Sequence, residues 1–237
     1  MVAKNLIDFD KQWSAMMAKK PEEFDDPTEL ENFYTSTAEF PAGFMTHYAP
    51  SLVVAEAGHQ ELATGFTVGK RFKSAPVLRV CDTNPVHLGH QARADGRWRI
   101  YVFADAAAPG QGDGTTSKVE DFAEWLVTAH DSPLAATPSD LDGDAWFDVR
   151  VIYQQDHTQI DINEVPAVFR PTVGPFRLNY LEKVFGADPA NDIFDLRGLS
   201  RDGVVVVVRP DQYVANVLPL TATAELAAFF APLLTLG

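Results

Sequence analysis

Five consecutive valines at positions 204–208 are the feature that most constrains the fold of this chain. β-Branched side chains favour an extended backbone, and a run that is apolar on both faces is typical of a buried strand. Pro210-Asp211 predicts a turn, so residues 213–218 are expected to return as the antiparallel partner. An amphipathic helix is predicted next, on the apolar spacing of Leu226, Phe229, Phe230, Leu233 and Leu234, with Pro232 ending or kinking it.

A strand is predicted upstream at residues 97–103, where polar and apolar residues alternate before the segment becomes fully apolar. Asp95-Gly96 lies directly before it and is typical of a hairpin turn. We therefore expect a hairpin that joins this strand to one at residues 86–91.

Strand and helix patterns alternate between these two regions. Ser117 and Glu120 have the spacing of a helix-capping box. Residues 146–153 have high strand propensity, and Pro175 is expected to open a helix that ends at Gly186. From residue 97 onward the predicted order is β-α-β-α-β-β-α. That is the order of the thioredoxin fold, an α/β fold with helices on both faces of its sheet.

The first fifty residues are predicted to be helical extensions of this domain. Apolar residues recur there at helical spacing: Leu6, Phe9, Trp13, Met16 and Met17. A second helix is predicted to start at Asp26-Pro27 and to end by Pro41. Short apolar runs at 52–55 and 77–80 predict further strands. We expect two regions, the helices in 1–50 and the thioredoxin-like domain in 51–237.

The charge of the chain limits its partners. A formal net charge of −14 disfavours nucleic acid and anionic membranes. No apolar run approaches the roughly 20 residues of a spanning helix, and the N-terminus lacks the apolar core of a signal peptide. A single cysteine is typical of a reducing compartment, so we expect a cytoplasmic protein.

Disulfide exchange of the thioredoxin kind requires a thiolate at the start of the helix after the first strand. Residues 104–118 occupy that place and contain no cysteine. The one thiol, Cys81, ends an apolar run, and we interpret it as a small buried apolar side chain. The sequence therefore predicts a thioredoxin-like domain without redox activity.

Other chemistry is equally unsupported by the sequence. His87 and His90 are the closest histidine pair, and in a strand they would point to opposite faces rather than bind one metal. Asp142 and Asp144 are expected to be solvated in a polar loop. The glycine-dense segment 110–114 lacks both the P-loop ending and the full dinucleotide fingerprint, so we interpret it as a flexible loop.

Four segments resemble class A flavoprotein aromatic hydroxylases. Residues 209–215 (R-P-D-Q-Y-V-A) resemble the R-P-D-x-Y/H-V/I-A hairpin near the C-terminus of that family. Residues 94–104 (A-D-G-R-W-R-I-Y-V-F-A) and 69–77 are similar to the D-G-R-x-R-x-Y-x-F-A and G-x-R-x-P-x-x-V stretches of phenol 2-monooxygenases. Residues 6–10 are similar to the helix that leaves the flavin domain there. The resemblance is strongest to the phenol 2-monooxygenase and 3-hydroxybenzoate 4-monooxygenase branch.

The resemblance implies a C-terminal, thioredoxin-like dimerisation region that lacks the FAD-binding domain. Members of the family bind FAD through a G-x-G-x-x-G fingerprint and use NADPH and oxygen to hydroxylate a phenol beside its hydroxyl group. That fingerprint does not occur here. No catalytic, cofactor-binding or metal-binding residue of the family is therefore carried over, and no cofactor is expected in this chain. Residues 1–50 would be linking helices that pack on a flavin domain.

Three functions remain open from the sequence. The first is a non-catalytic domain that holds hydroxylase subunits together, either as a homodimer or against a flavin-binding partner. The second is a subunit of a split monooxygenase that is active only with a separate FAD-binding chain. The third is a module that binds small phenolic ligands through Trp98, Tyr101, Phe103 and Trp146, residues that also suit an ordinary core.

Two surfaces are candidates for the subunit interface. One is the C-terminal hairpin, whose edge is expected to be exposed and to invite pairing. Its candidate residues are Tyr213, Val214 and Val217. The other lies on the N-terminal helices, with the candidates Phe33, Tyr34 and Phe40.

Overall fold

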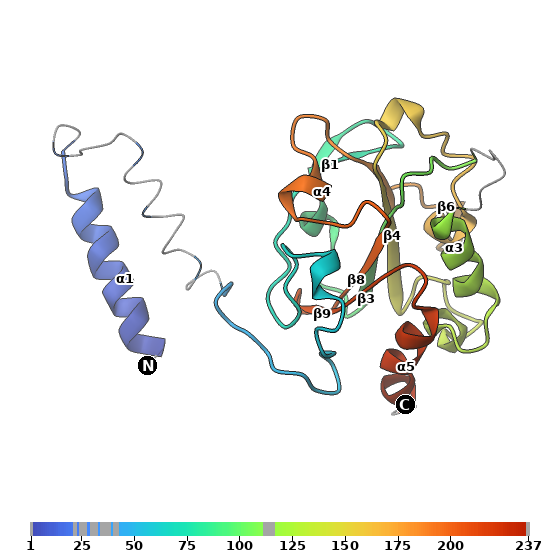
Figure 1. Ribbon diagram of the computed structural model, residues 1–237, viewed down its shortest axis with the longest axis horizontal. Helices are drawn as coiled ribbons and strands as arrows, with labels where there is room; N and C mark the ends of the chain where they lie inside the picture. The colour runs from blue at the N-terminus through green and yellow to red at the C-terminus, as the bar shows by residue number, and fades with distance from the viewer. Residues whose placement is uncertain are drawn as a thin grey trace. The chain divides into compact units, whose positions relative to one another are not determined.

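A computed structural model describes residues 2–20, 43–110 and 117–235, together with residues 23, 28, 33 and 39. The chain divides into two compact units, residues 1–47 and 48–237 (Figure 1). Each unit is described by itself.

The larger unit is built on a seven-stranded sheet in the order β2-β1-β7-β4-β3-β8-β9. β3 and β4 are parallel, β8 runs antiparallel to β3, and β9 runs antiparallel to β8. These four strands have the order and directions of a thioredoxin fold, which β7, β1 and β2 extend beyond β4. The strands are β1 Pro76–Arg79, β2 Pro85–His87, β3 Trp98–Phe103, β4 Phe147–Tyr153, β7 Val184–Gly186, β8 Val204–Val208 and β9 Val214–Leu218.

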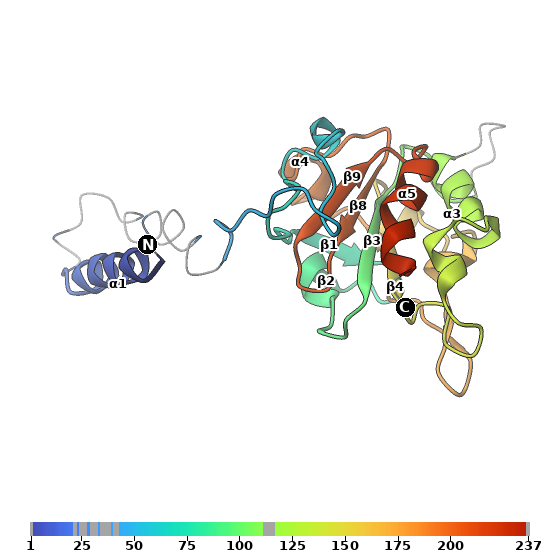
Figure 2. The same ribbon diagram turned by 90° about the horizontal axis from the view of Figure 1, so that it is seen from below.

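Two apolar layers cover the two faces of this sheet, and Figure 2 shows helices α3 (Lys118–Thr128) and α5 (Thr223–Leu234) together on one of these faces. Successive side chains of a strand point to opposite faces, so Ile100 and Val102 enter one layer while Tyr101 and Phe103 enter the other. Helices α3 and α5 cover the first face. Residues 54–77 and the short helix α4 (Ile193–Leu196) cover the second. Helices therefore lie on both faces, as the sequence predicted.

Most of the predicted thioredoxin-like elements are confirmed. The strands at 97–103, 146–153, 204–208 and 213–218 match β3, β4, β8 and β9 to within a residue or two. α5 continues to Leu234, two residues past Pro232, because a proline in the last turn removes only one helical hydrogen bond. Short 3₁₀ turns connect the elements: η2 Gln60–Leu62, η3 Leu88–Gln91, η4 Pro133–Ala136, η5 His157–Gln159 and η6 Ala167–Phe169.

The start of α3 is fixed by polar side chains. Ser117 Oγ accepts a hydrogen bond from the Val119 amide at 3.2 Å, which confirms the predicted cap. Asp105 accepts two more, from the Lys118 amide at 2.8 Å and from Ser117 Oγ at 3.1 Å. The Asp105 carboxylate therefore accepts a hydrogen bond from a free amide of the first helical turn, and its negative charge is favourable at the electropositive N-terminus of the helix.

The helix predicted between Pro175 and Gly186 is wrong. This segment instead forms the hairpin of β5 (Thr172–Val173) and β6 (Leu178–Asn179), followed by β7. Val184 and Phe185 are fully buried and pair in parallel with β4, so pairing within the sheet prevails over their helical spacing. The helical connection before β8 is the four-residue α4.

The hairpin predicted between residues 86–91 and β3 is also wrong. Gly96 does turn the chain, with a φ of +80°. However, β2 ends at His87 and pairs with β1 through Val77↔Val86, on the far side of the sheet from β3. The predicted strand at 52–55 contributes only an isolated bridge between Ser51 and Val54.

These differences move two groups that the sequence placed elsewhere. Cys81 lies in the turn between β1 and β2 and is exposed, because β1 ends at Arg79. Since the chain leaves β2 at His87 and enters η3, the rings of His87 and His90 stack 5.2 Å apart rather than pointing to opposite faces.

The smaller unit contains α1 (Val2–Met17). The rings of Phe9, Trp13 and Phe33 stack on one another with centroid separations of 6.4 to 6.5 Å. Most of the second predicted helix lies outside the described residues. None of the helices that the structure describes is long and apolar enough to span a lipid bilayer.

Candidate functional site

The edge of β9 is covered by the chain itself. The amides of Ala55 and Gly69 donate to the carbonyls of Ala215 and Val214, both at 2.8 Å, and the Val214 amide donates to Lys70 at 2.9 Å. Val214 and Val217 are consequently buried in the core. The exposed edge that the sequence predicted at this hairpin is therefore not present, and of its three candidates Tyr213 is the one that keeps a partly accessible side chain.

Tyr213 belongs to a surface cluster of two tyrosines and one arginine. Its ring meets that of Tyr48 edge to face, with centroids 4.8 Å apart. The Arg209 guanidinium lies over both rings, 4.6 Å from the centroid of Tyr48 and 5.6 Å from that of Tyr213. Such contacts combine ring packing with cation–π attraction. We call Tyr48, Arg209 and Tyr213 the aromatic–arginine cluster.

The R-P-D-Q-Y sequence explains why this cluster forms. Asp211 accepts two hydrogen bonds from Arg209, at 3.0 and 2.5 Å, and so fixes the orientation of the guanidinium. The Gln212 amide donates to the Arg209 carbonyl at 2.9 Å, and Gln212 takes a left-handed φ of +72°. This tight turn returns Tyr213 beside Arg209, where its ring can stack.

The other three interface candidates belong to the smaller unit. Phe33 stacks with Phe9 and Trp13 as described above. Tyr34 and Phe40 lie outside the described residues. The role of these three residues in an interface stays a prediction.

A buried ionic cluster lies where β3 and β4 begin, next to β7. The strand register places Arg99 opposite Asp148, and Tyr101 opposite Arg150. Lys183 has no exposed surface and lies 2.6 Å from Asp144 and 2.9 Å from Asp148. The members of the cluster are Asp95, Arg97, Arg99, Asp144, Asp148, Arg150 and Lys183.

These ion pairs lower the pKa values of Asp95 and Asp148. Burial alone would raise the pKa of Asp148, but Arg150 and Lys183 hold it far below its usual value. Burial opposes the shift of Asp95 too, and hydrogen bonds from Arg97 and Arg99 lower its pKa to about 2. Burial raises the pKa of Tyr101, which lies against the cluster, to about 12. The carboxylates of Asp95 and Asp148 are therefore charged structural groups rather than proton donors near neutral pH.

The sequence prediction for Asp144 is wrong. This carboxylate is not solvated: it is buried, and its Oδ2 is within 2.8 Å of Arg97 and 2.6 Å of Lys183. The sequence did contain a sign of this cluster. Asp148 and Arg150 alternate with apolar residues in a predicted strand, and charged residues that are buried in a strand require partners of opposite charge. Nothing in the local sequence around Lys183 indicated that it is buried, because it is the fold that brings it to Asp144.

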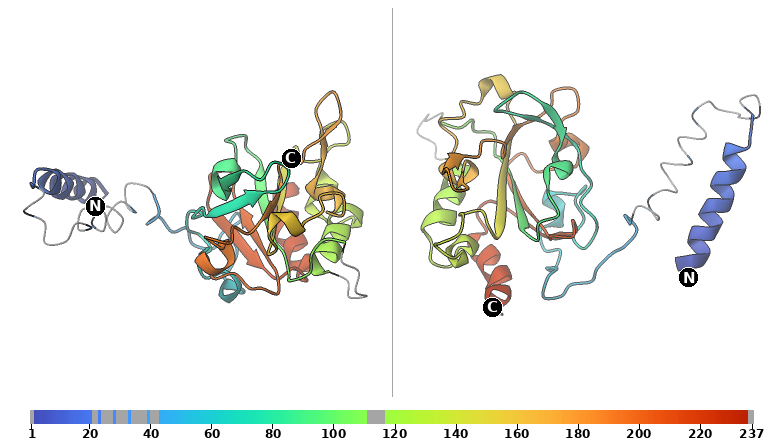
Figure 3. Two further views of the ribbon diagram at one scale, coloured as in Figure 1. Left: turned by 90° about the horizontal axis from the view of Figure 1, so that it is seen from above. Right: turned by 180° about the vertical axis from the view of Figure 1, so that it is seen from behind.

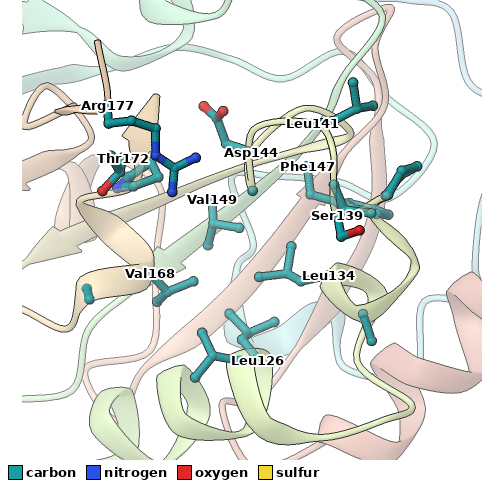
Figure 4. A pocket seen from close by; sticks show the side chains of 17 residues that line it. Leu126, Leu134, Ser139, Leu141, Asp144, Phe147, Val149, Val168, Thr172 and Arg177 are labelled. Atoms are coloured by element: carbon teal, nitrogen blue, oxygen red, sulfur yellow. The ribbon is translucent and has the colours of Figure 1, made fainter. Parts of the chain in front are cut away.

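A cavity of about 540 Å³ opens between α3, η4, β4 and the β5–β6 hairpin. Its floor is apolar, and Figure 4 shows Leu126, Leu134, Val149 and Val168 converging on it. Asp144 and Arg177 lie toward one end. The hairpin that carries Arg177 projects from the sheet beside residues 138–146 (Figure 3), and the Gly174 amide ties it there by donating to Asp142 at 2.9 Å.

The phenolic pocket considered from the sequence does not form from its four residues. Tyr101 and Phe103 are buried in the layer opposite α5. Trp98 and Trp146 line a separate cavity of about 370 Å³ beside α5. Within the described residues, no group of three or more His, Cys, Asp or Glu side chains is placed to hold a metal ion.

The fold defines the class of this protein. It is a thioredoxin-like domain in which Ser117 and Asp105, rather than a cysteine, lie at the N-terminus of α3, the helix that follows β3. The chain belongs to the family described as phenol hydroxylase, C-terminal dimerisation domain, whose model matches residues 46–236.

The relatives of the chain are longer proteins. It is 46% identical over 242 residues to the 3-hydroxybenzoate 4-monooxygenase of Comamonas testosteroni, covering 97% of this chain and 37% of that protein. It is 28% identical to the FAD-dependent monooxygenase terD of Aspergillus terreus (97% and 39% covered) and 27% identical to the phenol 2-monooxygenase fsqG of Aspergillus fumigatus (97% and 38%). The chain therefore spans less than two-fifths of the length of each relative.

Two solved structures are also similar. The flavin-dependent monooxygenase PieE, solved with FAD and substrate, aligns at 15% identity and a TM-score of 0.43, covering all of this chain and 38% of PieE. The lipoprotein thioredoxin Etrx1 of Streptococcus pneumoniae aligns at 11% identity and a TM-score of 0.33, covering 66% of this chain and 98% of Etrx1.

The N-terminus of α3 does not suit the pyrophosphate of a flavin dinucleotide. In dinucleotide-binding folds the pyrophosphate lies at the N-terminus of the helix after the first strand. Here the Asp105 carboxylate takes that position, with its Oδ2 2.8 Å from the Lys118 amide. A phosphate placed there would meet a negative charge that already satisfies the helix end.

Proposed function

We propose that this chain is a non-catalytic dimerisation and assembly domain of a phenol hydroxylase-type aromatic monooxygenase that depends on FAD and NADPH. The observation that carries the proposal is the match of residues 46–236 to a family described by its dimerisation. The relatives, whose names denote monooxygenases, are more than twice as long, so the flavin chemistry is assigned to a region that this sequence lacks.

The aromatic–arginine cluster is the surface that we assign to self-association. Tyrosine and arginine are enriched among the residues that contribute most to protein interfaces. Tyr48 is 41% exposed, and Arg209 is fixed beneath its ring by Asp211. A two-fold dimer places the same surface of both subunits in contact, so each cluster would pack against its copy. Val214 and Val217 of the same hairpin are buried in the core and are not part of this surface.

Within the predicted region 1–50, the helical part that precedes Tyr48 is proposed to pack on the flavin domain, and the larger unit that begins at Tyr48 is proposed to form the assembly domain. Large apolar side chains of α1 support the first assignment, since Leu6, Ile7 and Met17 are each about half exposed. An apolar helix face of this kind needs a partner to remove it from water. Phe33, stacked on Phe9 and Trp13, is assigned to the same surface.

A reducing compartment, the cytoplasm, is proposed as the location. Cys81 is a free and exposed thiol, which oxidising conditions would join to other thiols. The acidic charge of the chain also makes nucleic acid an unfavourable partner.

Light scattering of the purified chain tests the assembly function. We expect a mass of two chains at micromolar concentration and no visible flavin absorption. A single-chain mass at every concentration up to the millimolar range, or a purified protein that carries flavin, would contradict the proposal.

A second candidate function uses the exposed face of α1 differently. In a split monooxygenase, that face would bind a separate FAD-binding chain. Mixing the two chains would then yield a stable complex that oxidises NADPH when a phenolic substrate is added. The assembly proposal predicts that the complex with an FAD-binding chain depends on α1. It also predicts that a chain beginning at Tyr48, the first residue of the larger compact unit, still self-associates.

A further inference from the structure

The cavity between α3, η4, β4 and the β5–β6 hairpin has the character of a small-molecule site. Its volume of about 540 Å³ lies within the range of roughly 300–1,000 Å³ that is usual for ligand pockets. Its apolar floor is contributed by four separate elements: Leu126 of α3, Leu134 of η4, Val149 of β4 and Val168 of η6. A floor of this shape accommodates one ring or a branched aliphatic body.

One cation faces this cavity without a partner. Arg177 lies in the turn of the β5–β6 hairpin at a left-handed φ of +51°, and no described residue forms an ion pair or side-chain hydrogen bond with its guanidinium. The hairpin is held at the mouth by the bond between the Gly174 amide and Asp142. The guanidinium is therefore presented at the rim of an apolar cavity, available to an anion.

Two further polar residues of the lining, Thr137 and Asp144, affect which ligand the cavity can take. Thr137 contributes a hydroxyl that is buried and has no hydrogen-bond partner among the described residues, and a buried polar atom of this kind favours a ligand that can bond to it. Asp144 also lines the cavity, but its charge is compensated by Arg97 and Lys183 at 2.8 and 2.6 Å. An anion at Arg177 is therefore not opposed by an uncompensated carboxylate.

We propose that this cavity binds a small aromatic or alicyclic monocarboxylic acid. The carboxylate pairs with the planar guanidinium of Arg177, for which it is the matching partner, and the ring lies on Leu134 and Val149. A phosphate monoester suits the cavity less well, since a single cation with an apolar floor does not compensate two charges. Tyr48, Arg209 and Tyr213 are not part of the lining, so this binding function is separate from the proposed self-association.

The test is a titration of the full chain, labelled at its Leu and Val methyl groups, with benzoate, cyclohexanecarboxylate, benzyl alcohol and phenyl phosphate. We expect saturable shifts at the methyls of Leu126, Leu134, Val149 and Val168. We also expect both carboxylates to bind roughly tenfold or more tightly than the uncharged alcohol, and more tightly than the phosphate.

Variants make this test specific. Arg177→Gln should remove the preference for the carboxylates over benzyl alcohol, and Arg177→Lys should retain part of it. Lys70→Gln, which removes a charge from an exposed position outside the lining, should leave the preference unchanged. Ala167→Trp, at an exposed lining position, should block all four probes.

The methyl signals of Val204–Val208 report in each variant whether the fold is intact. The proposal is overturned if the shifts do not saturate, if they lie outside the cavity, or if a folded Arg177→Gln chain keeps the carboxylate preference.

Discussion

Lys183 and Asp144 form an ion pair of 2.6 Å in which the lysine side chain has no exposed surface. Asp148 lies 2.9 Å from the same ammonium group. A buried charge is tolerated only when its partners replace the water it has lost. These contacts therefore join the residue that precedes β7 to β4 and to the loop that precedes β4.

Removing the lysine charge should strongly destabilise the domain. Lys183→Met leaves Asp144 and Asp148 buried with one cation fewer, and we expect the free energy of unfolding to fall by about 3–5 kcal/mol. Urea denaturation followed by tryptophan fluorescence measures this change. Lys70→Met, at an exposed lysine, should change stability by less than about 0.5 kcal/mol. Equal losses in the two variants would show that the buried pair has no special role.

The stability of the chain should decrease in acid because of Asp95. Its pKa is lowered to about 2 in the folded state, whereas an unfolded aspartate titrates near about 3.9. A lowered folded-state pKa contributes stability above the unfolded value, and this contribution is lost as the pH falls from about 4 to about 2. Asp148, whose pKa is also lowered, acts in the same direction.

Urea midpoints measured between neutral pH and pH of about 2 test this dependence. The Asp95→Asn chain should be less stable than wild type at neutral pH, and the difference should shrink as the pH falls. A difference that does not change with pH would rule out the ion pairs of Asp95 as its cause.

A close backbone contact at Gly65 gives a third prediction. A Cβ atom added there would lie 2.7 Å from the Arg197 Cα and 2.8 Å from its carbonyl oxygen. The Gly65 amide also donates to that carbonyl at 2.8 Å, so the two chain segments cannot separate without losing the bond. Gly65→Ala should therefore destabilise by about 1–3 kcal/mol in thermal or urea unfolding.

Gly58 provides the matched control, since a Cβ there meets no atom within 4 Å. Gly58→Ala should be neutral or slightly stabilising, because alanine has less freedom in the unfolded chain. A Gly65→Ala chain as stable as wild type would mean that the segments at residues 65 and 197 are not in contact.

The sequence predicted the strands of the thioredoxin-like core well, since runs such as Val204–Val208 have strong local preferences. It failed where pairing across the sheet decides the structure. Val184 and Phe185 have helical spacing relative to Leu178 and Leu181, yet β4 draws them into the sheet. The ends of β1 and β2 were likewise placed too far along the chain, which misplaced Cys81 and the pair of His87 and His90.

The candidate interface was predicted only in part. Tyr213 was identified as a surface residue of the hairpin, but its partners Tyr48 and Arg209 were not. Tyr48 lies more than 160 positions away in the sequence, so no local pattern places its ring beside Tyr213. Val214 and Val217 were expected at an open edge. They are buried because residues 55–72 occupy that edge, a long-range contact that no local pattern in the valine hairpin indicates.

The dimer dissociation constant of variants in the aromatic–arginine cluster tests the central claim most directly. Tyr48→Ser and Tyr213→Ser should each weaken self-association by roughly tenfold or more in sedimentation equilibrium, as expected for rings at the centre of an interface. Phe176→Ser, which removes an 83% exposed ring at the tip of the β5–β6 hairpin, should leave the constant unchanged. Self-association that is unaffected in both tyrosine variants, or lost in Phe176→Ser instead, would contradict the account.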